Sequence, residues 1–249
     1  MNALSTLFPD FDAIVAYEKK IVFEKPTLIL AITPRTGSTH LCSMLKSLEI
    51  FGSPQEILNN RGVVQRKIKQ LEVKNFSEYI EKLVNEAGEC FSFKASWSDF
   101  EPISSICKEI FPNLKFIYLD RFDIVAQAIS LFRASETKIW HNRAGNELQY
   151  DKLSLEQLDV NKITTLMQML IKEKIEWEKY FFTNNLSVEH LYYEVIRHNW
   201  TRAAAMIAER FGYFNITPGN GEYLCLSDEN DINVIREFKA LYGYSWCIG

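Results

Sequence analysis

The hydrophobic and polar positions of the chain alternate between short apolar runs and longer stretches in which apolar residues recur every three or four positions. A short continuous apolar run is typical of a strand buried on both faces, whereas a spacing of three or four is typical of a helix with one buried face. Apolar or alternating runs predict strands at 27–32, 91–97, 114–119 and 186–193.

Helical spacing occupies most of the chain between and after these strands, and Asp123 is placed to cap one of the helices. Helices are expected at 9–20, from 38 to about 48, and at 75–84, 103–111, 124–135, 158–182, 194–211 and 230–242. Strands that alternate with helices along the whole length predict an α/β fold. We expect one three-layer, P-loop-like domain over 1–249, with a mainly parallel central sheet flanked by helices.

The segment between the first strand and its helix, Thr33-Pro-Arg-Thr-Gly-Ser-Thr39, has the composition of an anion-binding loop. Backbone N–H groups of such a loop point inward, and the helix dipole favours negative charge. Gly37 lets the backbone close around an oxyanion, while Ser38 and Thr39 can donate hydroxyls or cap the helix. Arg35 adds a planar charged group suited to phosphate or sulfate. The alternative is an ordinary capped turn, which the grouping of arginine, glycine and hydroxyls disfavours.

The loop departs from the signature of P-loop ATPases and kinases, G-x-x-x-x-G-K-[ST]. Ile32 stands at the first glycine, and Ser38 replaces the lysine that would reach the β- and γ-phosphates. The chain also lacks an apolar strand that ends in a clear magnesium-binding aspartate, unless Asp120 or Asp123 has that role. The cradle therefore suits a nucleotide with one 5′ phosphate better than a triphosphate, and a kinase or NTPase is kept as an alternative.

Further polar residues follow the predicted strands, and parallel strands bring their carboxyl ends to one edge of a sheet, where ligands bind. Lys94 and Arg121 lie near the ends of the second and third strands. Arg121 is as compatible with an ion pair to Asp120 or Asp123 as with a ligand contact. Glu56, in a turn after the first helix, can return over this edge, although position alone favours a solvated surface glutamate.

Two further segments offer ligand-binding groups. Ser130 lies on the second turn of the helix that follows Arg121. The loop after this helix contains Trp140, which can stack on a sugar or a base, and His141 and Arg143, which can bond oxyanions or hydroxyls. The alternative for the loop is a tryptophan that pins it to the body, with a solvated histidine.

The composition excludes several classes of function. The 249 residues are 47% hydrophobic and 24% charged with a net charge of −4, which argues against non-specific binding to nucleic acid or anionic membranes. No apolar run approaches the ~20 residues of a membrane span. The first residues lack the basic-then-apolar order of a secretory signal. Five scattered cysteines without metal-ligand spacing predict buried free thiols, and together these features predict a cytoplasmic protein.

Four ordered motifs resemble those of sulfotransferases that use 3′-phosphoadenosine 5′-phosphosulfate, most closely the bacterial trehalose 2-sulfotransferase type. The resemblance covers roughly residues 27–210. The family patterns are T-P-R-S-G-S-T-L-L-C, G-x-P-x-E, R-x-D-x-x-x-Q-A-x-S and T-x-x-W-H, matched in turn by Thr33–Cys42, Gly52–Glu56, Arg121–Ser130 and Thr137–His141.

The resemblance implies a role for each matched residue. Glu56 would be the general base that takes a proton from a sugar hydroxyl, and Arg35 would stabilise the departing 5′-phosphate. Lys94, Trp140 and His141 would contact the substrates. The residues that would bind the donor, 3′-phosphoadenosine 5′-phosphosulfate, are Arg35, Thr36, Gly37, Ser38 and Thr39 at the 5′-phosphosulfate and Arg121 and Ser130 at the 3′-phosphate.

The resemblance further implies a carbohydrate or glycolipid acceptor, no metal, and a possible homodimer. His40 stands where the trehalose branch has leucine, and Ile57 and Leu58 stand where it tends to have aromatic residues beside the glutamate. These positions are expected to border the acceptor site, so acceptors other than trehalose remain open. Asp120 makes the third motif less basic than is typical of the family. A non-catalytic nucleotide-binding protein that keeps the cradle is the third alternative.

Overall fold

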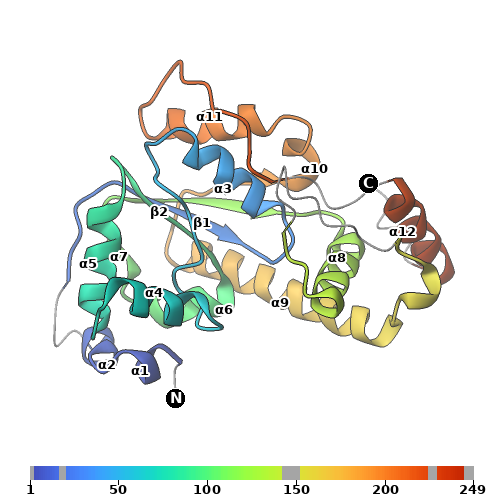
Figure 1. The fold of residues 1–249 in the computed structure, drawn as a ribbon, viewed down its shortest axis with the longest axis horizontal. Coiled ribbons are helices and arrows are strands. Elements are labelled where there is room, and N and C mark those ends of the chain that lie inside the picture. Colours follow the sequence, from blue (N-terminus) through green and yellow to red (C-terminus); the bar gives the residue numbers. More distant parts are fainter. Residues whose placement is uncertain (1–2, 17–20, 142–151, 224–228, 244–249) are drawn as a thin grey trace.

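A computed structural model describes residues 3–16, 21–141, 152–223 and 229–243. Its centre is a parallel sheet with the strand order β2-β1-β3-β4, as the alternation of strands and helices predicts (Figure 1). The strands are β1 (Thr27–Ile32), β2 (Phe91–Ser96), β3 (Leu114–Asp120) and β4 (Glu189–Tyr192).

The register of the sheet brings three strand ends together. Ile32, the last residue of β1, pairs with Ser96 of β2 on one side and with Leu119 of β3 on the other. The chain leaves β1 for a neighbour on one side and later returns to its other side, so the carboxyl end of β1 is a topological switch point, the usual ligand site of open α/β sheets.

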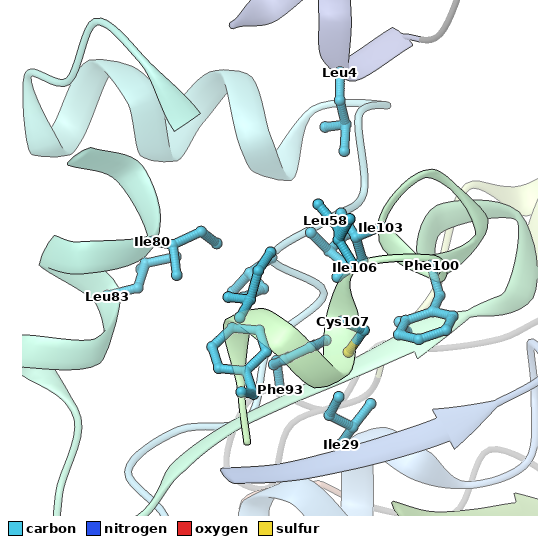
Figure 2. Close-up of a cluster of buried hydrophobic side chains, with 14 of the residues drawn as sticks. Leu4, Ile29, Leu58, Ile80, Leu83, Phe93, Phe100, Ile103, Ile106 and Cys107 are labelled. Carbon is cyan, nitrogen blue, oxygen red and sulfur yellow. The ribbon is translucent and has the colours of Figure 1, made fainter. Parts of the chain in front are cut away.

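Helices cover both faces of the sheet (Figure 1). Successive residues of β1 point to opposite sides, so both faces carry apolar side chains that the helices bury. Leu28 and Leu30 pack on the face covered by α3 (Ser38–Lys46) and α11 (Trp200–Arg210). The opposite face carries a larger cluster that includes Ile29 and part of α9 (Val160–Thr183). Figure 2 shows this cluster, with Ile29 beneath Phe93, Phe100 and Cys107.

The other helices differ from expectation mainly at their boundaries. The capping role predicted for Asp123 is confirmed, because its carboxylate accepts a hydrogen bond of 2.9 Å from the N–H of Ala126. These helices are α1 (Ala3–Leu7), α2 (Phe11–Val15), α4 (Val63–Leu71), α5 (Phe76–Glu86), α6 (Trp97–Phe100), η1 (Glu101–Ile103), α7 (Cys107–Ile110), α8 (Ile124–Thr137), η2 (Leu155–Gln157), α10 (Tyr193–Ile196) and α12 (Glu229–Leu241).

Two of the expected helices are broken. The helix expected at 103–111 is only α7, since a 3-10 turn, η1, occupies Glu101–Ile103 with a proline in its first turn. The helix expected at 194–211 is divided into α10 and α11, because the side chain of Asn199 caps a new helix by accepting from the N–H of Arg202 at 2.9 Å. The helices α1, α4 and α6 and the 3-10 turn η2 were not expected.

Three cysteines, Cys42, Cys90 and Cys107, are buried free thiols, as predicted. Burial raises the pKa of the Cys42 thiol to about 11, so it stays protonated and unreactive at neutral pH. Cys225 and Cys247 lie outside the described residues. None of the helices in the described ranges has the length and apolar character that a membrane span requires.

Candidate active site

The loop after β1 turns sharply into α3. Arg35 and Gly37 both have positive φ angles, of 68° and 79°. A Cβ atom on Gly37 would lie 2.6 Å from Cη2 of Trp200 and 2.9 Å from Cδ2 of Tyr193, so the position needs glycine for space as well as for conformation. The two aromatic rings wall one side of the loop.

The backbone of this turn leaves donors unused. Among the residues that the structure describes, the amides of Thr36, Gly37, Ser38 and Thr39 donate no hydrogen bond, and pairing resumes at His40, whose N–H donates to the Gly37 carbonyl at 3.0 Å. Four unpaired amides at the N-terminus of a nine-residue helix are donors of the kind that bind anions in proteins.

A lysine and a carboxylate meet beside these amides. The buried Nζ of Lys94 lies 3.0 Å from Oγ1 of Thr39, 3.5 Å from Oγ of Ser38 and 3.2 Å from Oε1 of Glu56. The contact arises because Gln55 pairs with β2, where its carbonyl accepts from the N–H of Lys94 at 3.0 Å. Glu56 is therefore not the solvated surface residue that its position alone suggested.

The carboxylate of Glu56 is held at both oxygens. Oε1 faces Lys94, and Oε2 accepts from Nδ2 of Asn59 at 3.2 Å. Its side chain is 32% exposed, so a hydroxyl group from solvent can reach it. By contrast, Ile57 and Leu58, expected to border an acceptor, are buried in the hydrophobic core at 4% and 1% exposure; the expectation was wrong, because the chain turns inward directly after Glu56.

Arg35 extends from the loop to α8 and the segment after it. Its Nε donates to Oγ of Ser130 at 3.0 Å, and one of its terminal nitrogens donates to the carbonyl of Trp140 at 2.7 Å. The structure thus brings together three residues predicted for the site from three separate motifs.

Arg121 lies behind the loop, with its side chain 13% exposed. One terminal nitrogen donates to the carbonyl of Arg35 at 3.1 Å, and the guanidinium lies 4.5 Å from the ring centre of Tyr193. Its acidic neighbour is Glu194, whose Oε1 is 3.8 Å from Nε. Glu194 also accepts from the N–H of Phe122 and thereby holds the turn in which Arg121 lies.

Neither aspartate that was considered as an ion-pair partner of Arg121 has that role. Asp120 pairs with Lys174 at 2.7 Å, and Asp123 pairs with Lys239 at 2.5 Å. Both lysines come from later helices, α9 and α12, which the sequence did not associate with this turn.

Aromatic and imidazole rings form the rim. Trp140 is 43% exposed, and the ring centre of His141 lies 5.7 Å from that of Tyr223. His40 has Nδ1 2.6 Å from the carbonyl of Tyr223, and its ring packs 4.9 Å from Trp200. Burial lowers the pKa of His40, so the ring is neutral at pH 7. Arg143, also expected here, lies outside the described residues.

Sequence reasoning missed a pair of polar residues at the end of β2 and in α6. Oγ of Ser96 donates to the buried carboxylate of Asp99 at 2.8 Å. Burial raises the pKa of Asp99 above its ordinary value of 3.8, the hydrogen bond from Ser96 opposes the shift, and the charge of Glu56 adds to it.

Two other missed residues hold the loop. Gln127 donates to the Thr33 hydroxyl, and Trp177 donates through Nε1 to the carbonyl of Ile32 at 3.0 Å. Trp177 is fully buried. Gln127 is a fixed position of the third motif, which is the signal that could have revealed it.

Comparison with known proteins points to one family. A family model described as Stf0 sulphotransferase matches residues 97–239, which include the Arg121–Ser130 motif, whereas the loop and Glu56 precede the match. No curated protein sequence matches the chain significantly.

Solved structures of sulfotransferases are similar to the chain. A sulfotransferase domain from the curacin biosynthetic pathway has 15% sequence identity and a TM-score of 0.50, over 77% of this chain and 75% of that domain. A sulfotransferase from Alicyclobacillus acidocaldarius has 10% identity and a TM-score of 0.48, over 89% of this chain and 97% of the other. Sulfotransferase STF9 from Mycobacterium avium has 13% identity and a TM-score of 0.48, over 97% of this chain and 74% of the other. At 15% identity, the likeness to the curacin-pathway domain concerns the fold alone.

The raised pKa of Asp99 predicts that the free energy of unfolding falls as the pH rises through the acidic range. Below pH 3.8 the carboxyl is protonated in both folded and unfolded chains. As the pH rises above this value, the unfolded chain releases the proton first, so stability falls until the folded-state pKa is passed. Asp99→Asn removes this penalty. Urea unfolding across acidic pH should show wild-type stability falling relative to the variant; a constant difference between the two would contradict the prediction.

Proposed function

The chain belongs to the Stf0 sulphotransferase family, and from that premise we propose that it transfers a sulfuryl group from 3′-phosphoadenosine 5′-phosphosulfate to a hydroxyl group of a carbohydrate or glycolipid. The observation that carries the proposal is the juxtaposition of unpaired loop amides with the Lys94–Glu56 pair. An anion site beside a carboxylate that solvent can reach suits transfer from a charged donor to a hydroxyl.

Donor binding uses the loop amides together with two residues that follow β3. The amides of Thr36–Thr39 hold the 5′-phosphosulfate, and Arg121 with Ser130 holds the 3′-phosphate. Arg35 now contacts two neutral acceptors, a hydroxyl and a carbonyl. Because hydrogen bonds to an anion are stronger, the donor would draw the guanidinium away from them. Arg35 then stabilises the charge that develops on the departing 5′-phosphate.

Transfer proceeds in line. The acceptor oxygen forms a bond to sulfur while the bond from sulfur to the 5′-phosphate oxygen breaks, and Glu56 takes the acceptor proton. Lys94 lies between Glu56 and the hydroxyl of Thr39, so it can contact the moving sulfonate while it orients the base. In this scheme Glu56 is the base, Lys94 contacts the sulfonate, and Arg35 stabilises the leaving group.

Acceptor binding is assigned to the rim. A partly exposed indole stacks on the apolar face of a sugar ring, and imidazole groups bond its hydroxyls. Trp140, His141 and His40 offer these groups near Arg35 and the loop. With Ile57 and Leu58 buried in the core, the choice of acceptor falls to this rim.

The alternatives differ in their chemistry. A kinase or NTPase needs a group to reach β- and γ-phosphates, and Ser38 occupies the position of the P-loop lysine. Magnesium-dependent ATP turnover that is lost in Arg35→Ala would favour it. A non-catalytic nucleotide-binding protein would bind 3′-phosphoadenosine 5′-phosphate yet sulfate no acceptor.

We also propose that residues 1–249 form a single domain and that the protein is a cytoplasmic homodimer. Buried free thiols support a reducing compartment. Ile171, Ile175 and Phe182 are 43%, 57% and 88% exposed along α9. In an antiparallel pair of α9 helices centred on Ile175, Lys172 of each copy would face Glu178 of the other, so the surface is self-complementary.

Replacement of Arg35 should weaken donor-site binding. For Arg35→Ala we expect affinity for 3′-phosphoadenosine 5′-phosphate, measured by calorimetry, to fall about 10- to 100-fold, since a hydrogen bond to a charged group contributes about 1.5–3 kcal/mol. Arg202→Ala is the control, because Arg202 is exposed on α11. No binding by the wild type at millimolar ligand would refute the proposed donor.

Replacement of Glu56 should affect transfer more than donor binding. Glu56→Gln keeps the shape but removes the base, so sulfate transfer to an accepted sugar should fall about 10²- to 10⁴-fold while the affinity for 3′-phosphoadenosine 5′-phosphate changes little. Glu81→Gln, at an exposed position of α5, is the control. If transfer survives in Glu56→Gln, the base has been assigned wrongly.

A charge on the α9 surface should prevent dimer formation. Ile175→Glu places two carboxylates opposite each other at the centre of the proposed pair. Sedimentation should then show a monomer where the wild type is a dimer, and the double charge reversal Lys172→Glu with Glu178→Lys should remain dimeric. A monomeric wild type, or a dimer unaffected by Ile175→Glu, would rule out this interface.

A further inference from the structure

Four consecutive backbone carbonyls, from Ile32 to Arg35, each accept a hydrogen bond from a side chain. Two of the donors belong to the turn after β3 and to α8, one belongs to α9, and one belongs to the loop. The pairs are Trp177 Nε1 with the Ile32 carbonyl at 3.0 Å, Thr36 Oγ1 with Thr33 at 3.1 Å, Gln127 Nε2 with Pro34 at 2.7 Å, and an Arg121 terminal nitrogen with Arg35 at 3.1 Å.

These bonds determine which way the loop amides point. A peptide unit is planar and trans, so the N–H of one residue points opposite to the carbonyl of the residue before it. Holding the carbonyls of Pro34 and Arg35 toward Gln127 and Arg121 therefore turns the amides of Arg35 and Thr36 the other way. If the peptide unit between Arg35 and Thr36 rotated, the Arg35 carbonyl oxygen would replace the N–H of Thr36 and repel an anion, and rotation of the preceding unit would displace the same segment.

Gln127 is the donor best suited to this task and has no other evident use. It is fully buried on the first turn of α8, and Nε2 donates to the Thr33 hydroxyl at 2.8 Å as well as to the Pro34 carbonyl. A carbonyl cannot donate, so the NH2 group must face Pro34, which fixes the orientation of the amide.

The remaining amide atom argues against a space-filling role. Oε1 of Gln127 is buried and has no hydrogen-bond partner within the described part of the chain. An unpaired buried acceptor is unfavourable, and an aliphatic side chain of similar length would fill the space without it. The two donated bonds are therefore what glutamine contributes at this position.

The conformation of Arg35 shows why such a clamp is needed. Its φ of 68° is uncommon for a residue with a Cβ atom and persists only where neighbouring contacts impose it. Gln127 fixes the carbonyl on one side of this residue, and Arg121 fixes the carbonyl on the other.

We propose that Gln127 is a positioning residue: by holding the Pro34 carbonyl it fixes the backbone at Arg35 and so keeps the amides that follow, beginning with Thr36, turned toward the anion, without touching the ligand. The inference rests on the proposed function only for the identity of that anion. Arg121 serves both as a ligand contact and as a clamp, whereas Gln127 is fully buried and acts through the loop backbone alone.

The test compares Gln127→Met with Gln168→Met, a control at an exposed position of α9. Amide shifts of 15N-labelled protein are followed during titration with 3′-phosphoadenosine 5′-phosphate and, separately, with inorganic sulfate, and stability is measured by urea unfolding. In Gln127→Met we expect about tenfold weaker binding of both probes and altered shifts at 35–37 in the free protein. The KM for the donor should rise while the KM for the acceptor stays unchanged.

A second variant covers the case in which Gln127→Met does not fold. Thr33→Val keeps the shape of the residue and removes one of the two acceptors of the Gln127 amide. The affinity for both probes should therefore fall by a smaller factor. In the double variant the two effects should not add, because they concern one hydrogen bond.

The outcomes separate the two proposals. If Gln127→Met is less stable but binds both probes as the wild type does, the positioning role is overturned and the donor assignment stands. If the wild type binds sulfate at the loop amides but not 3′-phosphoadenosine 5′-phosphate, the donor assignment fails, and the loss of sulfate binding in Gln127→Met still supports the positioning role. If the wild type binds neither probe, both proposals are refuted.

Discussion

The parallel pairing of β1 with both β2 and β3 is the constraint on which the site depends. The register aligns Ile32 with Ser96 and Leu119, so segments far apart in the sequence emerge at one edge of the sheet. Lys94 on β2 and Arg121 after β3 reach the loop from opposite sides for this reason. β1 lies in the interior of the sheet and is fully buried, and its residues from Leu28 to Ile32 are all apolar.

Electrostatic preorganisation then follows from the direction of a few peptide units. A loop whose carbonyls are held by side chains keeps its amides available before any anion arrives, so little rearrangement is needed on binding. The same contacts explain why α8 and α9 matter to a loop that precedes them by about a hundred residues. The fold and the site are linked here through Trp177 and Gln127.

The sequence predicted those features that depend on local pattern. The parallel α/β sheet, the glycine-containing turn between β1 and α3 and the cap at Asp123 follow from apolar runs, glycine and polar residues at their own positions. The sequence did not predict features that depend on contacts between distant segments of the chain. The partners of Asp120 and Asp123 come from α9 and α12, and the burial of Ile57 depends on packing against elements far along the chain. The roles assigned to Glu56 and Arg35 remain predictions.

The central claim is that this cradle serves sulfuryl transfer and not phosphoryl transfer. The most direct measurement incubates the protein with a panel of sugars and glycolipids and either of two donors: 3′-phosphoadenosine 5′-phosphosulfate labelled in its sulfuryl group, or ATP labelled in its γ-phosphate with magnesium. The account predicts label in at least one acceptor from the first donor and none from the second. Transfer or hydrolysis with ATP, and no label from the sulfuryl donor, would contradict it.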